Sequence, residues 1–298
     1  MVTVADIMNF METLAPRALK MDWDNVGLNC GSKKAPVSKI MVALDPFEHV
    51  CQEAVEWGAD LLVTHHPLIF RPWPMVTDDA AITRGLMNLV RHNISHFCAH
   101  TNLDCAKGGV NDVLADVLGL KNVSIVTENE WGMLRCGEVP EQELDRFLAS
   151  VKDHLHCQGL RYCNGGRKVH KVAVGGGGCA GGLYDAILAG CDTFVTSDVK
   201  YNDFWDAYEQ GLNLIDAGHF CTENPVISVL AEKIAAAFPE VEISAGITDL
   251  VHCAPAAIPL SPAVVGGYAL RYLSDGADSV YLFNFFINSR SRRSSSFV

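Results

Sequence analysis

The sequence has fewer basic than acidic side chains, and this shortage weighs against nucleic acid as a partner. It contains 23 lysine and arginine residues against 35 aspartate and glutamate residues, for a formal net charge of −12 at pH 7. An acidic surface repels the phosphate backbone, which supplies most nonspecific affinity for DNA and RNA. We therefore expect no nucleic-acid partner, although a metal ion or a locally basic pocket could still hold a small anion.

The sequence also lacks a run approaching the roughly 20 apolar residues that a membrane helix needs. Residues 1–14 carry Asp6 and Glu12, and they lack the positively charged start and apolar core of a signal peptide. These absences predict a protein with no membrane partner that resides in the cytoplasm.

Paired cysteine motifs are missing too, although the chain has 11 cysteines. None has Cys-x-x-Cys spacing, and an odd number in a chain of 298 residues is poor support for a disulfide framework. We interpret the cysteines as small buried thiols in a reducing compartment.

The first half of the chain alternates short apolar strands with amphipathic helices. Strands are expected at 39–44, 60–64 and 94–99, and helices at 3–15, 48–57, 83–92 and 109–118. Thr3 is the expected cap of the first helix, with Asp6 three residues further on. The residues 21–32 are expected to form a loop. This βαβαβα order predicts an α/β fold with a largely parallel sheet and a ligand site along its carboxyl edge.

The second half predicts two short antiparallel strands and then another α/β unit. Strands are expected at 124–127, 132–139, 169–174, 192–196 and 213–216, and helices at 142–151, 183–189, 202–210 and 225–238. We therefore divide the chain into a first α/β domain at 1–123, a second at 124–253, and an atypical, partly disordered tail at 254–298, which ends in serines and arginines.

Two adjacent histidines, His65 and His66, follow the strand at 60–64, and Pro67 ends it. Imidazole is the commonest metal-binding side chain, and the end of a buried strand is where α/β folds place ligand sites. Adjacent residues of a strand point to opposite faces. The pair therefore predicts either one metal ion with one bystander histidine, or two metal ions.

Three further polar groups follow expected strands. They are His100 with Asp104, Asp198 with Lys200, and His219 with Glu223. Singly, each has an ordinary structural interpretation as a hydrogen-bonded histidine, a capping aspartate or a glutamate in the first turn of a helix. Together, the strand-end rule brings them to one edge of the structure.

This set of imidazoles and carboxylates suits zinc, iron or manganese rather than calcium, which prefers oxygen ligands only. It is also larger than the tetrahedral set of a closed structural zinc site. The surplus favours two divalent metal ions with a bridging carboxylate. Two close ions would lower the pKa of a bridging water and brace the oxygens of a substrate.

A glycine run at 175–178 lies between an expected strand and helix. Gly176, Gly178 and Gly181 fit the pattern Gly-x-Gly-x-x-Gly, with Asp198 at about the dinucleotide-binding distance. A tight turn is the ordinary interpretation. A phosphate-binding loop stays open as the alternative.

Five motifs in order resemble those of the NIF-three-like proteins, also named GTP cyclohydrolase I type 2 homologs. They are Trp-Asp-Asn-Val-Gly-Leu at 23–28, Thr-His-His-Pro at 64–67, His-Thr-Asn-Leu-Asp at 100–104, Gly-Val-Asn-Asp at 109–112 and Gly-His-Phe-Cys-Thr-Glu at 218–223. The chain departs from this pattern at Tyr201-Asn202, where many members have Tyr-His, and after Asp249.

The resemblance implies two interlinked α/β domains, a dinuclear metal site in the cleft between them, and a toroidal homohexamer. It assigns the metal ligands to His65, His66, Asp104, His219 and Glu223, with Glu223 as the bridge, and it puts His100 beside the metals as a supporting residue or proton carrier. We expect a metal-dependent hydrolase with a small-molecule substrate, for which the family name suggests a nucleotide, and with His100 and Glu223 moving protons.

Two other functions compete with this expectation. The first is a non-enzymatic metal-binding scaffold or metal-trafficking protein, which the sequence does not exclude. The second is a transcription-related interaction protein, which the negative charge disfavours.

Overall fold

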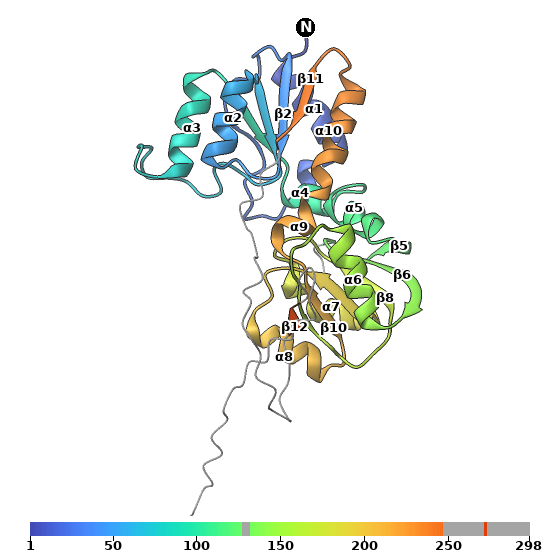
Figure 1. Ribbon diagram of the computed structural model, residues 1–298. Helices are drawn as coiled ribbons and strands as arrows, with labels where there is room; N and C mark the ends of the chain where they lie inside the picture. Colours follow the sequence, from blue (N-terminus) through green and yellow to red (C-terminus); the bar gives the residue numbers. More distant parts are fainter. Residues whose placement is uncertain (127–131, 247–270, 273–298) are drawn as a thin grey trace, which may run out of the picture.

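The structure is a computed structural model that describes residues 1–126, 132–246 and 271–272. Within these residues the chain forms a mixed α/β fold with two sheets, as predicted (Figure 1). The expected tail at 254–298 lies outside the described residues except for Arg271 and Tyr272. In the described part, no helix is both long and apolar enough to cross a membrane, and no cysteine forms a disulfide.

The first sheet has the strand order β1-β4-β3-β2-β11. These strands are β1 (Gly27–Cys30), β2 (Lys39–Ala43), β3 (Leu61–Thr64), β4 (Ser95–Cys98) and β11 (Glu242–Ala245). Its neighbouring strands run parallel except for β1, which is antiparallel to β4. The expected loop at 21–32 therefore contains a strand. This strand has no clear apolar alternation, because Gly27 and Asn29 interrupt it.

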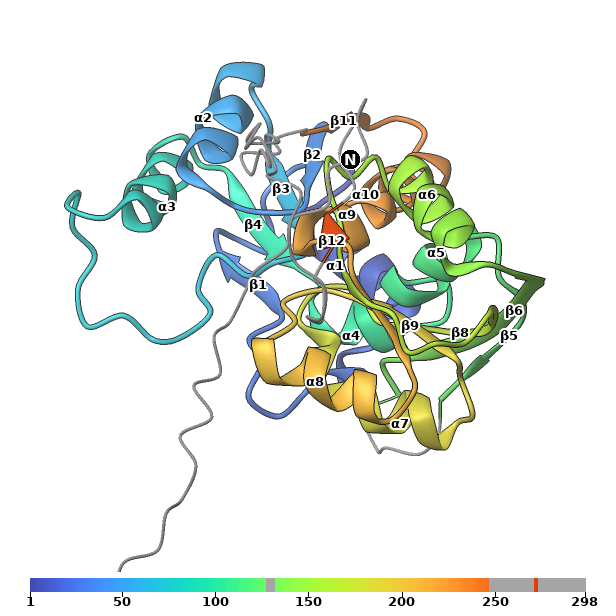
Figure 2. The ribbon, with the colours of Figure 1, turned by 60° about the horizontal axis from the view of Figure 1, so that its bottom comes forward.

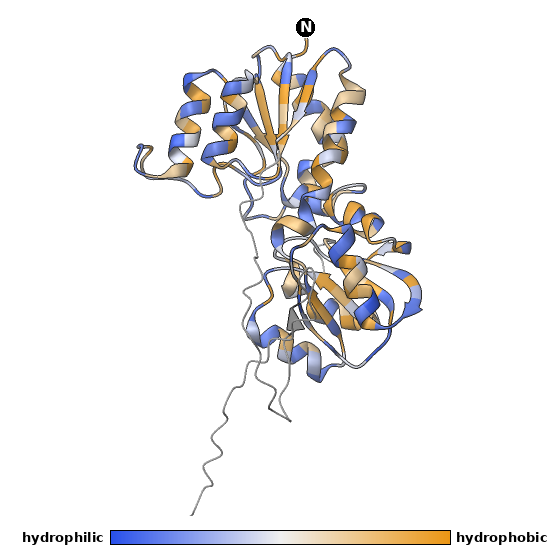
Figure 3. Ribbon diagram, in the orientation of Figure 1, coloured by the Kyte–Doolittle hydropathy of each residue, from blue (hydrophilic) through white to orange (hydrophobic). Residues whose placement is uncertain are grey.

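Helices cover both faces of the first sheet, because alternate residues of its strands point to opposite sides. Ile40 and Val42 of β2 pack with α1 (Val4–Leu14) and α10 (Pro225–Ala237), whereas Met41 packs with α2 (Glu48–Trp57) and α3 (Ala81–Arg91). Figure 1 shows these two helix pairs on opposite sides of the strands. This double covering explains why β2 and β3 are apolar over most of their length (Figure 3).

The second sheet has the strand order β12-β7-β10-β9-β8-β6-β5. Its strands are β5 (Lys121–Ile125), β6 (Arg135–Gln142), β7 (Arg161–Cys163), β8 (Val169–Val174), β9 (Thr193–Thr196), β10 (Asn213–Asp216) and β12 (Arg271–Tyr272). Only the central strands β8, β9 and β10 are mutually parallel. The expectation of antiparallel strands after residue 123 is confirmed by the β5–β6 pairing, although β5 begins earlier and β6 later than predicted.

Helices cover both faces of this sheet as well (Figure 2). One face packs on α5 (Val110–Val117) and α6 (Leu144–His154), and the other on α7 (Leu183–Leu188) and α8 (Tyr201–Glu209). The expected helices of both halves are therefore present, with ends shifted by a few residues.

The chain returns to the first sheet near its described end. After β10 it forms the short helix α9 (His219–Glu223), then α10, whose apolar face packs into the core of the first sheet, and then β11 at the edge of that sheet. The sequence placed residues 124–253 in the second domain, yet α10 and β11 pack with the first sheet. The division into domains otherwise stays a prediction. The return of the chain places α9 next to both sheets (Figure 1).

The first helix begins with the predicted cap. The Thr3 hydroxyl accepts a hydrogen bond from the backbone N–H of Asp6 at 3.4 Å, and the Asp6 carboxylate accepts one from the backbone N–H of Thr3 at 2.8 Å. This reciprocal arrangement satisfies two backbone donors that a helix start otherwise leaves without partners.

We predict that Thr3→Ala lowers the free energy of unfolding by about 1 kcal/mol, because the cap is lost. Urea denaturation followed by circular dichroism measures this value. Thr13→Ala is the matched control, because Thr13 is an exposed threonine of the same helix whose hydroxyl donates only to the Phe10 carbonyl within its own turn. Equal stability of the two variants would contradict the proposed cap.

Candidate metal centre

His65 and His66 lie just beyond the end of β3, where the chain still pairs with the segment after β2. The His65 amide donates to the Ala43 carbonyl at 3.2 Å, and the His66 amide to the Leu44 carbonyl at 2.9 Å. Because regular strand geometry has ended at Thr64, the two rings do not point to opposite faces as strand periodicity predicts. Their centroids are 4.9 Å apart.

Helix α9 contributes a third histidine and the central carboxylate. His219 and Glu223 are one turn apart and share a face of this helix, and the His219 Nε2 atom lies 3.1 Å from Glu223 Oε2. The His66 Nε2 atom lies at the same distance, 3.1 Å, from that oxygen. Two histidines that are 153 residues apart in sequence therefore meet at a single carboxylate oxygen.

The other oxygen of Glu223 faces a different group. Glu223 Oε1 lies 3.7 Å from His65 Nε2, which in turn lies 3.5 Å from Asp104 Oδ1. Asp104 belongs to the short helix α4 (Thr101–Cys105), which follows β4. Three donor groups have the spacing of a metal site, and two of them share Glu223: one consists of His66, His219 and Glu223, one of His65, Asp104 and Glu223, and one of His65, His66 and His100.

Several of these atoms are buried without a hydrogen bond. His65, Asp104 and Glu223 are 0%, 5% and 3% exposed. Within the described residues, His65 Nε2, Asp104 Oδ1 and Glu223 Oε2 form no hydrogen bond. A buried polar atom without a partner is costly, so each such atom calls for an explanation. A metal ion at these atoms would supply the missing interactions.

The opposite ring nitrogen of each histidine has a hydrogen-bond acceptor. The Nδ1 atoms of the four histidines lie 2.7–2.9 Å from acceptor oxygens: His65 from the Ala99 carbonyl, His66 from Asp45, His100 from Asp24 and His219 from Asp198. An N–H donated from Nδ1 leaves Nε2 as the lone-pair atom. Metal-binding histidines are commonly oriented in this way, so the donor set fits divalent metal ions.

The pKa values reflect this crowding of charge. Burial favours neutral His66, but the neighbouring carboxylates of Asp45 and Glu223 outweigh it and raise the pKa of His66 to about 10. The pKa of His219 is raised to about 9 because Glu223 and Asp198 outweigh its burial. Burial lowers the pKa of His65. Burial together with the neighbouring Glu223 charge raises the pKa of Asp104 well above its usual value.

Glu223 shows the opposite balance to Asp104. Burial disfavours its charged form, yet the imidazoles of His65, His219 and His66 hold the pKa of Glu223 well below its usual value. Without a metal ion, protons on the imidazoles balance this buried carboxylate. A bound cation would take over the same role.

His100 lies beside the centre. Its ring centroid is 5.2 Å from that of His65 and 5.5 Å from that of His66. Asp24 holds it in place: one Asp24 oxygen accepts from His100 Nδ1 at 2.9 Å, and the other accepts from the Thr101 amide at 3.1 Å. Hydrogen bonds from His100 and Thr101 outweigh burial and lower the pKa of Asp24 to about 2.

The glycine run at 175–178 packs against the centre. A Cβ atom on Gly177 would lie 1.9 Å from Glu223 Oε1 and 3.1 Å from His219 Nε2, and Gly177 has a φ of +60°. The amide of Gly176 donates to Asn111, and that of Gly177 donates to Thr222. Because these two amides already have partners, the loop serves close packing, which supports the tight-turn interpretation over a phosphate cradle.

Two of the supporting carboxylates were not predicted from the sequence. Asp24 and Asp45 were not chosen as site residues, although Asp45 lies two residues after the end of β2 and so obeys the strand-end rule that selected the others. Asp198 was chosen, and it lies beside His219 as an acceptor. Lys200 caps α8 and has no described contact with the centre.

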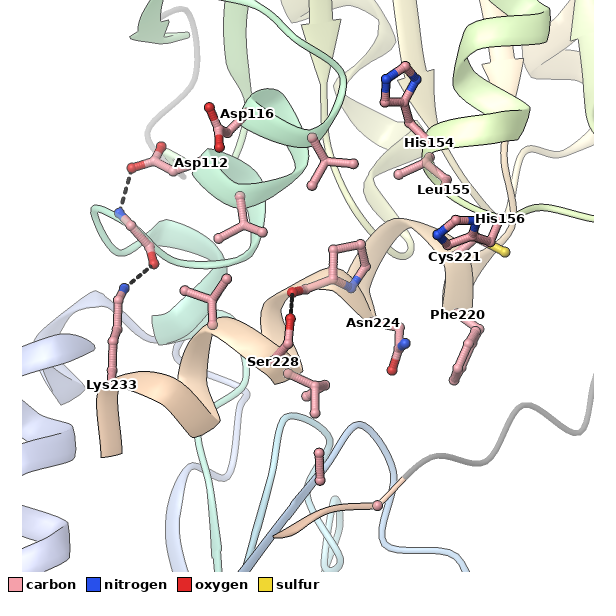
Figure 4. Close-up of a pocket in the computed structure, with 18 residues that line it drawn as sticks. Asp112, Asp116, His154, Leu155, His156, Phe220, Cys221, Asn224, Ser228 and Lys233 are labelled. Carbon is pink, nitrogen blue, oxygen red and sulfur yellow. Dashed lines mark hydrogen bonds between the residues drawn. The ribbon is translucent and has the colours of Figure 1, made fainter. Parts of the chain in front are cut away.

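A separate cavity of about 790 Å³ lies on the other side of α9. Phe220, Cys221 and Asn224 line it (Figure 4), whereas His219 and Glu223 belong to the candidate donor groups. Neighbouring residues in the segment 219–224 therefore face two different environments, the candidate metal centre and this cavity. None of the candidate metal ligands lines this cavity.

Known proteins match this chain over most of its length. The family model described as Duf34/NIF3 (NGG1p interacting factor 3) matches residues 2–250. The chain belongs to the Duf34/NIF3 family. A relative from Clostridium acetobutylicum named GTP cyclohydrolase 1 type 2 homolog is 36% identical over 251 residues, covering 82% of this chain and 94% of the relative. The resemblance inferred from the five motifs is thus confirmed.

Two further comparisons agree. A Clostridium perfringens relative of the same name is 37% identical over 235 residues, covering 77% of this chain and 90% of its own length. The crystal structure of a hypothetical protein from Staphylococcus aureus has a TM-score of 0.78 and 28% identity, covering 84% of this chain and 98% of that one. This chain therefore resembles a solved structure in fold as well as in sequence.

We predict that Gly177→Ala weakens metal binding by roughly 10- to 100-fold, because its methyl group would displace the Glu223 carboxylate. Competition with a coloured chelator measures the affinity. Two controls separate the causes. Gly181→Ala adds a methyl group with no atom within 4 Å, and Gly166→Ala does the same at a φ of +79°. If Gly166→Ala loses as much affinity as Gly177→Ala, backbone strain rather than the clash is responsible.

We also predict that the metal-free protein loses stability as the pH rises. The pKa values of His66 and His219 lie near 10 and 9, above the usual 6.5. Their protonation therefore stabilises the fold fully below about pH 6.5, and this contribution disappears as the pH rises through about 9 to 10.

Thermal unfolding of chelator-treated protein across this pH range measures the loss. The double variant His66→Asn with His219→Asn should flatten the profile, whereas His92→Asn, on an exposed residue at the end of α3, should not. A wild-type profile that is already flat would contradict the assignment.

Proposed function

We propose that this chain is a metal-dependent hydrolase with a dinuclear centre in the cleft between its two α/β domains. The observation that carries the proposal is the position of the buried Glu223 carboxylate. Its two oxygens face different donor groups, one with His66 and His219 and the other with His65 and Asp104. A carboxylate in this position suits a bridge between two cations.

The donor chemistry supports zinc, iron or manganese. Each group offers imidazole nitrogen together with carboxylate oxygen, a mixture that these metals accept and that calcium does not. When bound, two such ions would lower the pKa of a water molecule and stabilise negative charge on the substrate.

The centre has an accessible side, as a catalytic site requires. The side chains of His66 and His219 are 19% and 39% exposed, in contrast to the buried His65. His100 is 15% exposed at its side chain and is oriented by Asp24. We assign His100 to proton transfer with the substrate, and Glu223 to holding the centre and accepting protons there.

The names of the relatives support the substrate class. The curated relatives are named GTP cyclohydrolase 1 type 2 homologs, so a nucleotide is the first small-molecule substrate to test. We further propose a cytoplasmic homohexamer with its sites facing an internal cavity, as the family resemblance implies.

The alternative is a non-enzymatic metal-binding scaffold or trafficking protein. The burial of His65, Asp104 and Glu223 favours it, because a fully buried donor group holds an ion with little exchange. Activity measurements on metal-loaded protein separate the two functions.

We predict two metal ions per chain in protein purified without added metal. His65→Ala should lose about half of the metal, because it serves only one of the two donor groups that share Glu223, and Glu223→Ala should lose nearly all of it. Elemental analysis measures the content, with His92→Ala as the control histidine variant. Complete loss in His65→Ala would instead indicate a single ion.

The same samples, tested against nucleotides, phosphodiesters and amides, examine the hydrolase assignment. Glu223→Ala should abolish turnover of any substrate that the wild type cleaves. Two tightly bound ions without turnover at any metal load would favour the scaffold. Full activity of a variant without metal would contradict the metal-dependent mechanism.

A further inference from the structure

Two exposed aromatic residues lie next to His100. Trp23 and Phe70, called here the aromatic pair, are 62% and 41% exposed. Their ring centroids are 5.8 Å apart, and each lies 6.2 Å from the centroid of His100. Large aromatic side chains that stay exposed beside a polar centre are typical of ligand contact rather than of the core.

Hydrogen bonds hold the aromatic pair in place. The Asn25 side chain donates to the Ile69 carbonyl at 2.5 Å, and the Ile69 amide donates to Asn29 Oδ1 at 3.1 Å. These bonds join the segment after Trp23 to the segment before Phe70. Because Asp24 also binds His100 and Thr101, both rings are fixed relative to the proposed centre.

The three rings are nearly perpendicular to one another. The interplanar angles are 73° between Trp23 and Phe70, 72° between Trp23 and His100, and 80° between Phe70 and His100. A flat ring that stacks on one of these side chains presents its edge to another, and both are favourable aromatic geometries. Such an arrangement suits a planar guest.

With the proposed metal ions bound, positive charge would lie on both sides of the aromatic pair. The Arg71 guanidinium lies 5.9 Å from the centroid of Phe70, and among the described residues it forms no ion pair. The proposed metal ions add positive charge on the other side, beyond His100. A quaternary ammonium group, the usual guest of an aromatic cage, would be repelled there.

We propose that the aromatic pair binds a planar, neutral or anionic aromatic ring of the substrate and so holds its reacting bond at His100 and the metals. This inference rests on the proposed function for the identity of the centre. It adds Trp23 and Phe70 as the residues that determine specificity for a ring.

The test compares two carboxylates of equal charge, planar 2-naphthoate and its saturated analogue decahydro-2-naphthoate. Both carboxylates can bind the metals or Arg71 in the same way, so a difference in affinity between the two acids reports on the ring. Ligand-observed NMR titration of the metal-loaded protein should show about tenfold tighter binding of the planar acid, as expected from stacking on aromatic side chains.

Trp23→Ala and Phe70→Ala should each remove most of this preference, whereas Trp23→Phe should retain it. Both residues are exposed, so the variants should fold. Tyr184→Ala is the control, because Tyr184 is 51% exposed on α7, outside the aromatic pair.

Equal binding of the two acids, or binding of neither at millimolar concentration, would overturn the inference. The inference would also fail if the alanine variants changed the oligomeric state but still preferred the planar acid. The aromatic pair would then be a contact with another copy of this chain. Metal analysis of the same samples keeps the two proposals distinct. If the protein binds no metal but prefers the planar acid, only the proposed function is contradicted. If it binds two ions but does not prefer the planar acid, only this inference is contradicted.

Discussion

The carboxylate of Glu223 is the group on which the rest of the centre depends. It is 3% exposed, and a buried negative charge is costly unless positive charge accompanies it. Imidazoles of His65, His66 and His219 surround it, and Gly177 lies so close that even a methyl group would not fit. The surrounding chain is therefore built around an anion that needs cations, whether these are protons on the histidines or metal ions.

This requirement explains the unusual path of the chain. His65 and Asp104 follow strands of the first sheet, whereas His219 and Glu223 follow β10 of the second. Helix α10 then runs directly from α9 into the core of the first sheet. A chain that finished its second sheet and stopped there would leave α9 without this anchor. The return to the first sheet brings candidate metal ligands from both sheets to within 4 Å of one another.

Three aspartates further from the centre orient its histidines. Asp45, Asp24 and Asp198 each face the Nδ1 atom of one histidine and so turn the Nε2 atoms inward. Asp24 connects these supporting carboxylates to the aromatic pair, because it directly follows Trp23 in the sequence and its side chain accepts a hydrogen bond from His100. Metal binding and ring recognition would thus share a single rigid segment of the chain.

The sequence by itself predicted the α/β class, most helices and strands, the cap at Thr3, and the family. It could do so because these depend on local periodicity, on caps and on motifs within a few residues. It also selected His65, His66, His100, Asp104, His219 and Glu223 through the strand-end rule and the family motifs. Their assignment as metal ligands and proton carriers stays a prediction.

Only the tertiary structure decided which oxygen of Glu223 faces which histidine, why Gly177 has no side chain, and where β11 and α10 pack. It also brought Trp23 and Phe70 together across more than forty residues of sequence. The contacts of Glu223 with His65 and His66 depend on how the two sheets are placed against each other. Local patterns carry no information on this placement, because these residues meet only after the chain has returned to its first sheet.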